Sequence, residues 1–147
     1  MKQDVCTIGF AKKSLQQFVE LLKGAGVTHL IDTRLNNTSQ LSGYAKKGDL
    51  EYVMKLVGIS YYHDLSLAPT EDILNAYKKK QMTWEEYEKR YMDLLANRKI
   101  ENRIDDVLAD EVNCFLCSED KPHHCHRRLL AEYLNQHKKD IRVVHLV

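Results

Sequence analysis

The sequence predicts an α/β fold, a three-layer sandwich with a mostly parallel, Rossmann-like sheet of about five strands. The order of the apolar and helical segments supports this prediction. Short apolar segments alternate with segments of helical periodicity, and that alternation is typical of parallel βαβ units. A longer helical stretch, residues 70–109, forms an insertion before the fourth strand. From a length of 147 residues we expect one domain, 1–147.

The first half of the chain predicts three strands and two helices. Residues 4–10 form a short apolar strand that ends at Gly9. Ser14 can cap the helix that follows, and Gly24 and Gly26 close that helix. The other elements of this half are a buried strand at 27–33, a polar loop at 35–48, a helix at 49–57 and a strand at 59–63.

The second half begins with the helical insertion. After a break at Pro69, Thr70 caps one helix, and Thr83 and Glu86 can form a capping box at the start of the next, residues 83–98. The remaining elements are a helical region at 104–109, a strand at 112–117, a helix at 125–138 and a last strand at 141–146.

Composition narrows the class of protein. A content of 44% hydrophobic and 29% charged residues is ordinary for a soluble globular protein. A formal net charge of +1 gives no general attraction to nucleic acid or membranes. We see no signal peptide and no apolar stretch long enough to span a bilayer. Four cysteines without an export signal are expected to be reduced thiols, and the protein to be cytoplasmic.

The carboxyl ends of the strands should carry the functional site, because ligands bind there in open parallel sheets. Arg34 follows the second strand, and Arg127 lies in the first turn of a helix. Each guanidinium offers a planar set of donors that matches phosphate or carboxylate, and a helix start adds free N–H groups. We therefore expect an anion pocket with at least one Asp–Arg or Glu–Arg ion pair. Gly9, Ser39 and His126 are the further residues expected to contribute to it.

Three residues at this edge are candidates for catalysis. Glu119 and Asp32 can act as acid, base or nucleophile beside the arginines, or can be their structural ion-pair partners. Cys125 stands at a helix start beside Arg127, which favours a reactive thiolate. The alternative for Cys125 is a thiol that only packs the start of the helix.

The cysteine spacing argues against a metal site. Cys114 and Cys117 lie three residues apart on one strand, so their side chains should face opposite sides of the sheet and cannot share a metal or a disulfide. We expect Cys114 and Cys6 to be buried core thiols, and the protein to carry no zinc. A site built from Cys117, Cys125 and one histidine stays open as an alternative. The candidate histidines are His123, His124 and His126.

The helix at 83–98 carries three aromatic residues on one face: Trp84, Tyr87 and Tyr91. This spacing favours packing in the core over a platform on which nucleic acid bases stack.

These residues also resemble a known family. Six short motifs stand in the order found in domain-of-unknown-function family 488. They are Thr7-Ile8-Gly9, Asp32-x-Arg34 with Ser39 following, Tyr62 before Leu67-Ala68-Pro69, Trp84-x-x-Tyr87, Leu116-Cys117-x-Glu119 and Cys125-His126-Arg127. The chain departs from that family at Phe10-Ala11, where a His or Tyr followed by Ser is typical, and at Asn36-Asn37, where a Pro is typical. The resemblance implies a compact α/β domain with a shared polar edge, and no particular reaction.

The functional prediction has two forms. The first is an enzyme, a transferase or hydrolase, that acts on a nucleotide, a nucleic acid or another phosphorylated substrate without a cofactor. The second is a non-catalytic ligand-binding or sensor module that uses the same anion pocket. The two differ in what they require, because an enzyme needs a nucleophile or base that reaches the ligand. The sequence does not fix the oligomeric state.

Overall fold

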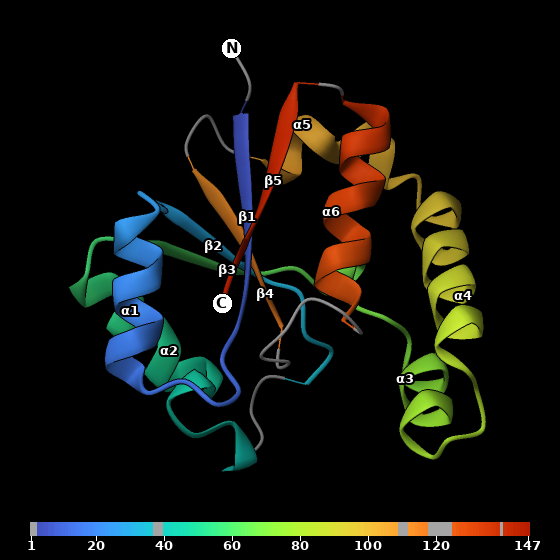
Figure 1. Cartoon of the computed structure of the whole chain (residues 1–147), viewed down its shortest axis with the longest axis horizontal. Coiled ribbons are helices and arrows are strands. Elements are labelled where there is room, and N and C mark those ends of the chain that lie inside the picture. Colours follow the sequence, from blue (N-terminus) through green and yellow to red (C-terminus); the bar gives the residue numbers. More distant parts are fainter. Residues whose placement is uncertain (1–2, 37–39, 109–111, 118–124, 139) are drawn as a thin grey trace.

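A five-stranded, all-parallel sheet forms the centre of the computed structural model, which describes residues 3–36, 40–108, 112–117, 125–138 and 140–147 (Figure 1). The strand order is β3-β2-β4-β1-β5. The strands are β1 (Gln3–Gly9), β2 (His29–Asp32), β3 (Ser60–His63), β4 (Asn113–Cys117) and β5 (Ile141–Leu146). Because every strand runs the same way, all five carboxyl ends lie at one edge of the sheet.

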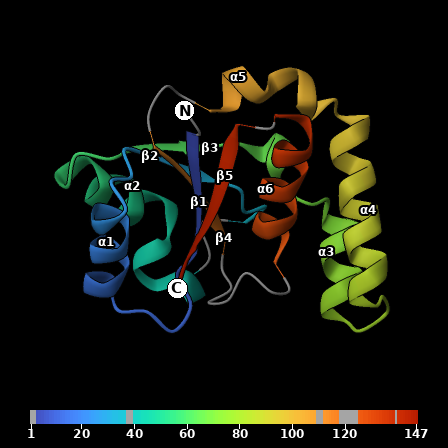
Figure 2. The same ribbon diagram turned by 45° about the horizontal axis from the view of Figure 1, so that its top comes forward.

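Helices cover both faces of the sheet, which gives the predicted three layers (Figure 2). One face carries α1 (Leu15–Gly24) and α2 (Lys47–Leu56), and the other carries α6 (His126–His137). The insertion supplies α3 (Glu71–Lys78), α4 (Trp84–Asn97) and α5 (Ile104–Val107) on the α6 side, where α4 packs against α6. The α/β fold class is confirmed.

Alternation along the strands divides the core into two parts. On β4, Cys114 and Leu116 pack with α1 and α2, whereas Phe115 packs with α4 and α6. Period-two alternation sends successive side chains to opposite faces. Cys117 therefore faces the α6 side, opposite Cys114, as the spacing predicted.

The predicted helix starts are present. Ser14 and Gln17 form a complete capping box at α1, and the Thr70 side chain accepts a hydrogen bond from Ile73 N–H at α3. At α4 only half of the expected capping box forms. The Thr83 side chain accepts from Glu86 N–H, and the Glu86 side chain lines a pocket instead.

Boundaries differ from the predictions in two places. The polar loop at 35–48 contains a 3₁₀ helix (Gln40–Ala45), and α2 begins inside the same predicted loop. The helical region predicted at 104–109 is preceded by a 3₁₀ helix (Ile100–Arg103). Lys99 adopts a left-handed conformation with φ of 54°, which ends α4 and turns the chain there.

Polar contacts anchor the insertion to the segment that follows β3. The Tyr91 hydroxyl donates to the Leu67 carbonyl at 2.6 Å, and Arg98 donates to the carbonyls of Ser66 and Ala68 at 2.6 and 2.7 Å. These contacts hold α4 and the α3–α4 connection beside the carboxyl edge of the sheet. The insertion thereby builds one wall of the site.

Candidate functional site

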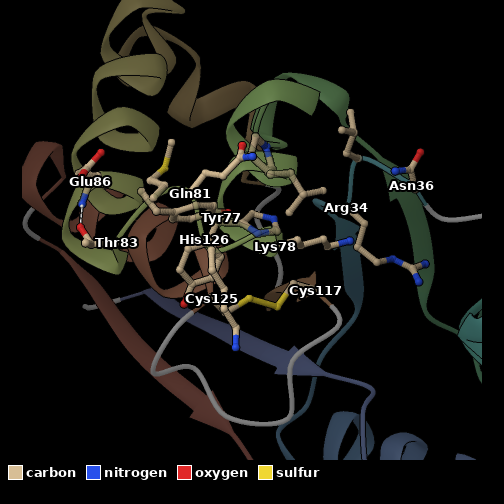
Figure 3. Close-up of a pocket in the computed structure, with 16 residues that line it drawn as sticks. Arg34, Asn36, Tyr77, Lys78, Gln81, Thr83, Glu86, Cys117, Cys125 and His126 are labelled. Atoms are coloured by element: carbon tan, nitrogen blue, oxygen red, sulfur yellow. Dashed lines mark hydrogen bonds between the residues drawn. A yellow bond between two sulfur atoms is a disulfide. The ribbon is translucent and has the colours of Figure 1, made fainter.

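A pocket of about 690 Å³ opens at the carboxyl edge of the sheet. Its walls come from the segment after β2, the start of α6 and the α3–α4 connection. Figure 3 shows the side chains that line it, with the Cys117–Cys125 disulfide beneath His126 and with Arg34 beside Asn36. The position agrees with the rule that parallel sheets bind ligands at their carboxyl ends.

Asp32 and Arg34 form a buried ion pair at the end of β2. Arg34 Nε and Nη2 donate to the two carboxylate oxygens of Asp32, each at 2.8 Å. The Tyr61 hydroxyl donates to Asp32 Oδ2 at 2.5 Å. Burial alone would raise the pKa of Asp32, but the Arg34 guanidinium and the Tyr61 hydrogen bond outweigh it and hold that pKa below its usual value. The expected Asp–Arg pair is confirmed.

Arg34 retains donor capacity after this pairing. Its Nη2 also donates to the Ala45 carbonyl at 2.6 Å, while its buried Nη1 has no hydrogen-bond partner among the described residues. The guanidinium carbon lies 5.3 Å from the centre of the Phe10 ring, within cation–π range. Phe10 stands where the family that this sequence resembles has His or Tyr. Here the face of its ring contacts the Arg34 guanidinium.

His126 connects β2 to the start of α6. Its Nε2 lies 2.8 Å from the Thr33 carbonyl oxygen, which can only accept, so Nε2 carries the proton. The Thr33 hydroxyl in turn donates to the Leu116 carbonyl at 2.8 Å. Burial lowers the pKa of His126 to about 4, so the imidazole is neutral near pH 7. His126 lines the pocket as a positioned neutral ring and brings no positive charge to it.

The cysteine pair corrects one expectation. Cys117 and Cys125 form a disulfide, with Cα atoms 7.3 Å apart. The prediction of four reduced thiols is therefore wrong for these two residues, and Cys125 is not a free nucleophile in this state. Cys6 and Cys114 are free and buried, as predicted. The bonded residues are eight positions apart in the sequence, and a pattern of strands and helices does not predict that the two would meet.

Arg127 lies beneath the pocket, behind its lining. The side chain is fully buried, and its Nη1 donates to Cys117 Sγ at 3.4 Å. It does not line the pocket, and neither does Asp32, which is also fully buried. Gly9 pairs with Cys117 in the sheet register at the same edge. Glu119 and Ser39, the other predicted site residues, lie outside the described residues.

Comparison with known proteins gives one match. The model of the family described as Domain of unknown function DUF488 matches residues 14–134 of this chain. The chain belongs to the DUF488 family. No curated protein is detectably similar. No solved structure is detectably similar either.

In this DUF488 protein the insertion forms one wall of the pocket, and the sequence did not predict that wall. Its pocket-lining side chains include Tyr77, Lys78, Lys80 and Glu86. The lysine run at 78–80 was visible in the sequence, but exposed charge runs usually face solvent alone. Only the way the insertion folds back places this run at the carboxyl edge.

The aromatic residues of α4 pack in the core, as predicted. Tyr87 and Tyr91 are buried, and Trp84 packs against the same cluster. The Tyr77 and Tyr87 rings lie 5.0 Å apart, centre to centre, and both reach the pocket. Burial raises the pKa of Tyr87 above its usual value, so its hydroxyl stays protonated at neutral pH.

Neither a metal cluster nor a membrane helix is found in the described part of this DUF488 protein. No three His, Cys, Asp or Glu side chains there are grouped so that they could hold an ion. His123 and His124, named for the zinc alternative, lie outside the described residues. None of the described helices is both long and apolar enough to cross a bilayer.

Proposed function

We propose that this DUF488 protein binds a small anionic ligand with a planar ring, of the nucleotide class, in the pocket at the carboxyl edge of the sheet. The observation that carries the proposal is the imbalance of charge in the lining. Among the described residues, Lys78 and Lys80 line the pocket against a single carboxylate, Glu86, while the charge of Arg34, which also lines it, is balanced by Asp32. A cleft lined by one sign of charge concentrates ligands of the opposite sign.

The buried guanidinium of Arg34 supports the anionic part of this proposal. Arg34 is only 4% exposed, and its charge is already paired with Asp32. Its Nη1, without a partner among the described residues, is a donor that an acceptor on a ligand would satisfy. The start of α6 lies at the same pocket, and helix N-termini favour negative charge.

The aromatic wall supports the ring-binding part. Tyr77 is half-buried, Tyr87 is buried, and both line the pocket within ring-contact distance of each other. Aromatic faces stack on any nucleobase, and such stacking contributes roughly 1–3 kcal/mol per base. A volume of about 690 Å³ is in the range typical of small-molecule sites.

We place binding ahead of catalysis. The Asp32 carboxylate is fully buried and occupied by Arg34 and Tyr61, and Cys125 is held in a disulfide. An enzyme needs a nucleophile or base within reach of the ligand. Glu119, the remaining catalytic candidate, lies outside the described residues, so an enzymatic role stays a prediction from the sequence.

Isothermal titration calorimetry with AMP, adenosine and inorganic phosphate tests the proposal. We expect AMP to bind more tightly than adenosine or phosphate alone, and its affinity to fall as salt is added. The double variant Lys78→Gln/Lys80→Gln should bind AMP several-fold more weakly, since each exposed lysine contributes about 0.2–1 kcal/mol to an ionic contact.

A control variant with the same change in charge is Lys55→Gln/Lys89→Gln. Lys55 lies on α2 and Lys89 is an exposed residue of α4, and neither lines this pocket. The control should bind AMP as the wild type does. Equal affinities for AMP and adenosine, or equal weakening by both double variants, would contradict the proposal.

A further inference from the structure

We propose that the Cys117–Cys125 disulfide is a redox-active group, reduced and re-formed by exchange with small anionic thiols that enter through the pocket. The bond joins the last residue of β4 to the residue before α6. Both cysteines line the pocket, although only 1% of Cys117 and 4% of Cys125 is exposed. Figure 3 shows the two sulfur atoms among the lining side chains.

Arg127 distinguishes Cys117 from the other cysteines. Its Nη1 lies 3.4 Å from Cys117 Sγ, and its guanidinium keeps its charge at any ordinary pH. An adjacent fixed positive charge favours the thiolate form of a cysteine. Reduction of the disulfide therefore releases an anion at Cys117 that already has a cationic neighbour.

The two free cysteines lack this arrangement. Burial raises the pKa of Cys6 to about 11, and burial raises the pKa of Cys114 well above its usual value. Both stay protonated and inert in the core. Only the disulfide pair combines access from a pocket with a cationic partner.

The exchange proceeds in two displacements. The thiolate of a small thiol attacks Cys125 Sγ, the S–S bond breaks, and its electron pair leaves on Cys117 Sγ beside Arg127. The better-stabilised thiolate is the faster leaving group, which selects Cys125 as the point of attack. A second small thiolate then attacks the mixed disulfide and releases Cys125, which takes a proton from solvent. Two small thiols thus become one small disulfide, and the reverse sequence re-forms the protein bond.

The pocket determines which thiols react. The sulfurs are almost fully buried, so a folded protein cannot reach them, whereas a volume of about 690 Å³ admits a small molecule. Arg34, Lys78 and Lys80 favour a negatively charged one. This preference rests on the proposed anion binding, whereas the reversible reduction does not depend on it.

The first test equilibrates the native full chain in buffers that span a range of reduced-to-oxidised glutathione ratios. Thiols are then alkylated and mapped by mass spectrometry. We expect Cys117 and Cys125 to become labelled together in one reversible transition, while Cys6 and Cys114 stay unlabelled and the circular dichroism spectrum is unchanged. Reduction that occurs only in denaturant, or only together with unfolding, would overturn the proposal.

The second test measures alkylation of reduced Cys117 against pH. We expect a midpoint below that of an ordinary thiol, about 8.5. Arg127→Gln should move this midpoint upward, whereas Arg128→Gln, whose native side chain pairs with Glu88 and Glu132, should not. If Arg127→Gln does not fold, the wild-type midpoint alone tests whether Arg127 favours the Cys117 thiolate. A wild-type midpoint at or above about 8.5 would overturn that role of Arg127.

The third test compares reduction rates with glutathione, mercaptoethanol and cysteamine, which are anionic, neutral and cationic. After correction for the thiolate fraction of each, glutathione should react fastest. Its advantage should disappear in Lys78→Gln/Lys80→Gln and at high salt. Equal rates for the three thiols, with reversible reduction intact, would overturn the anionic preference and the anion pocket with it. Failure of the first test alone would overturn the redox role and leave the proposed function standing.

Discussion

The ion pair of Asp32 and Arg34 shows what residue types alone can predict. Two positions apart on an extended chain, the side chains point to the same side, so the arginine can fold back onto the carboxylate. A buried carboxylate beside a guanidinium then pairs with it, because either charge alone would be costly to bury. The sequence predicted at least one Asp–Arg or Glu–Arg pair at this edge, and the structure shows which residues form it and adds the hydrogen bond from Tyr61 on the neighbouring strand.

Asp32→Asn should destabilise the protein strongly. The change leaves the buried Arg34 charge uncompensated, and breaking a buried ion pair in this way costs about 3–5 kcal/mol. Urea unfolding measures the effect. Asp4→Asn is the matched control, because Asp4 pairs with Arg142 at an exposed site, where solvent screening leaves such a contact little net effect on stability. Equal losses of unfolding free energy in the two variants would contradict the claim that burial makes the Asp32–Arg34 pair more important than an exposed pair.

The buried imidazole of His126 predicts a pH dependence of stability. Its pKa is lowered to about 4 in the folded protein, against an ordinary value of 6.5. Between these values the unfolded chain binds a proton that the folded protein does not, so stability falls as the pH drops from 6.5 towards 4. The loss is on the order of 3 kcal/mol.

Unfolding measured across this pH range tests that expectation. His126→Gln should flatten the dependence, whereas His137→Gln, an exposed residue at the end of the same helix, should leave it as in the wild type. A wild-type slope that survives in His126→Gln would show that another group titrates in this range.

At the scale of elements, local signals predicted the helices well and their placement poorly. Capping residues marked the starts of α1, α3 and α4, because a side chain bonds to its own helix three residues on. The direction in which α3 and α4 fold back depends on distant contacts. Tyr91 reaches Leu67 and Arg98 reaches Ser66, and no periodicity encodes those partners. For this reason the sequence did not predict the wall of the pocket that carries the lysines.

Tyr91→Phe should weaken the attachment of α4. The change removes the hydroxyl that donates to the Leu67 carbonyl inside the core. A buried acceptor left without a donor costs about 1–3 kcal/mol. Tyr52→Phe provides the control, since Tyr52 is 62% exposed on α2 and its hydroxyl is expected to contribute little. Urea unfolding of both variants measures the two effects. An unchanged unfolding midpoint for Tyr91→Phe would count against this anchoring contact.

At the scale of the whole molecule, the sequence predicted the layers and the carboxyl edge at which the pocket opens. Five apolar segments and their helices required a parallel sheet, and parallel strands bring their carboxyl ends together. The strand order was not predictable, because a buried pattern is the same for any inner strand. β4 in fact lies between β1 and β2, which places Cys117 beside Gly9 and next to the end of β2, the strand that Arg34 follows.

The central claim is that the carboxyl-edge pocket binds an anionic, ring-containing ligand. A nuclear magnetic resonance titration of ¹⁵N-labelled protein with AMP tests it most directly, because each backbone amide reports its own surroundings. We predict that the amides of Asn36, residues 77–81 and His126, all from pocket-lining segments, shift with a common affinity while those of α1 do not. Shifts confined to the α1–α2 face, or none at millimolar AMP, would contradict the account.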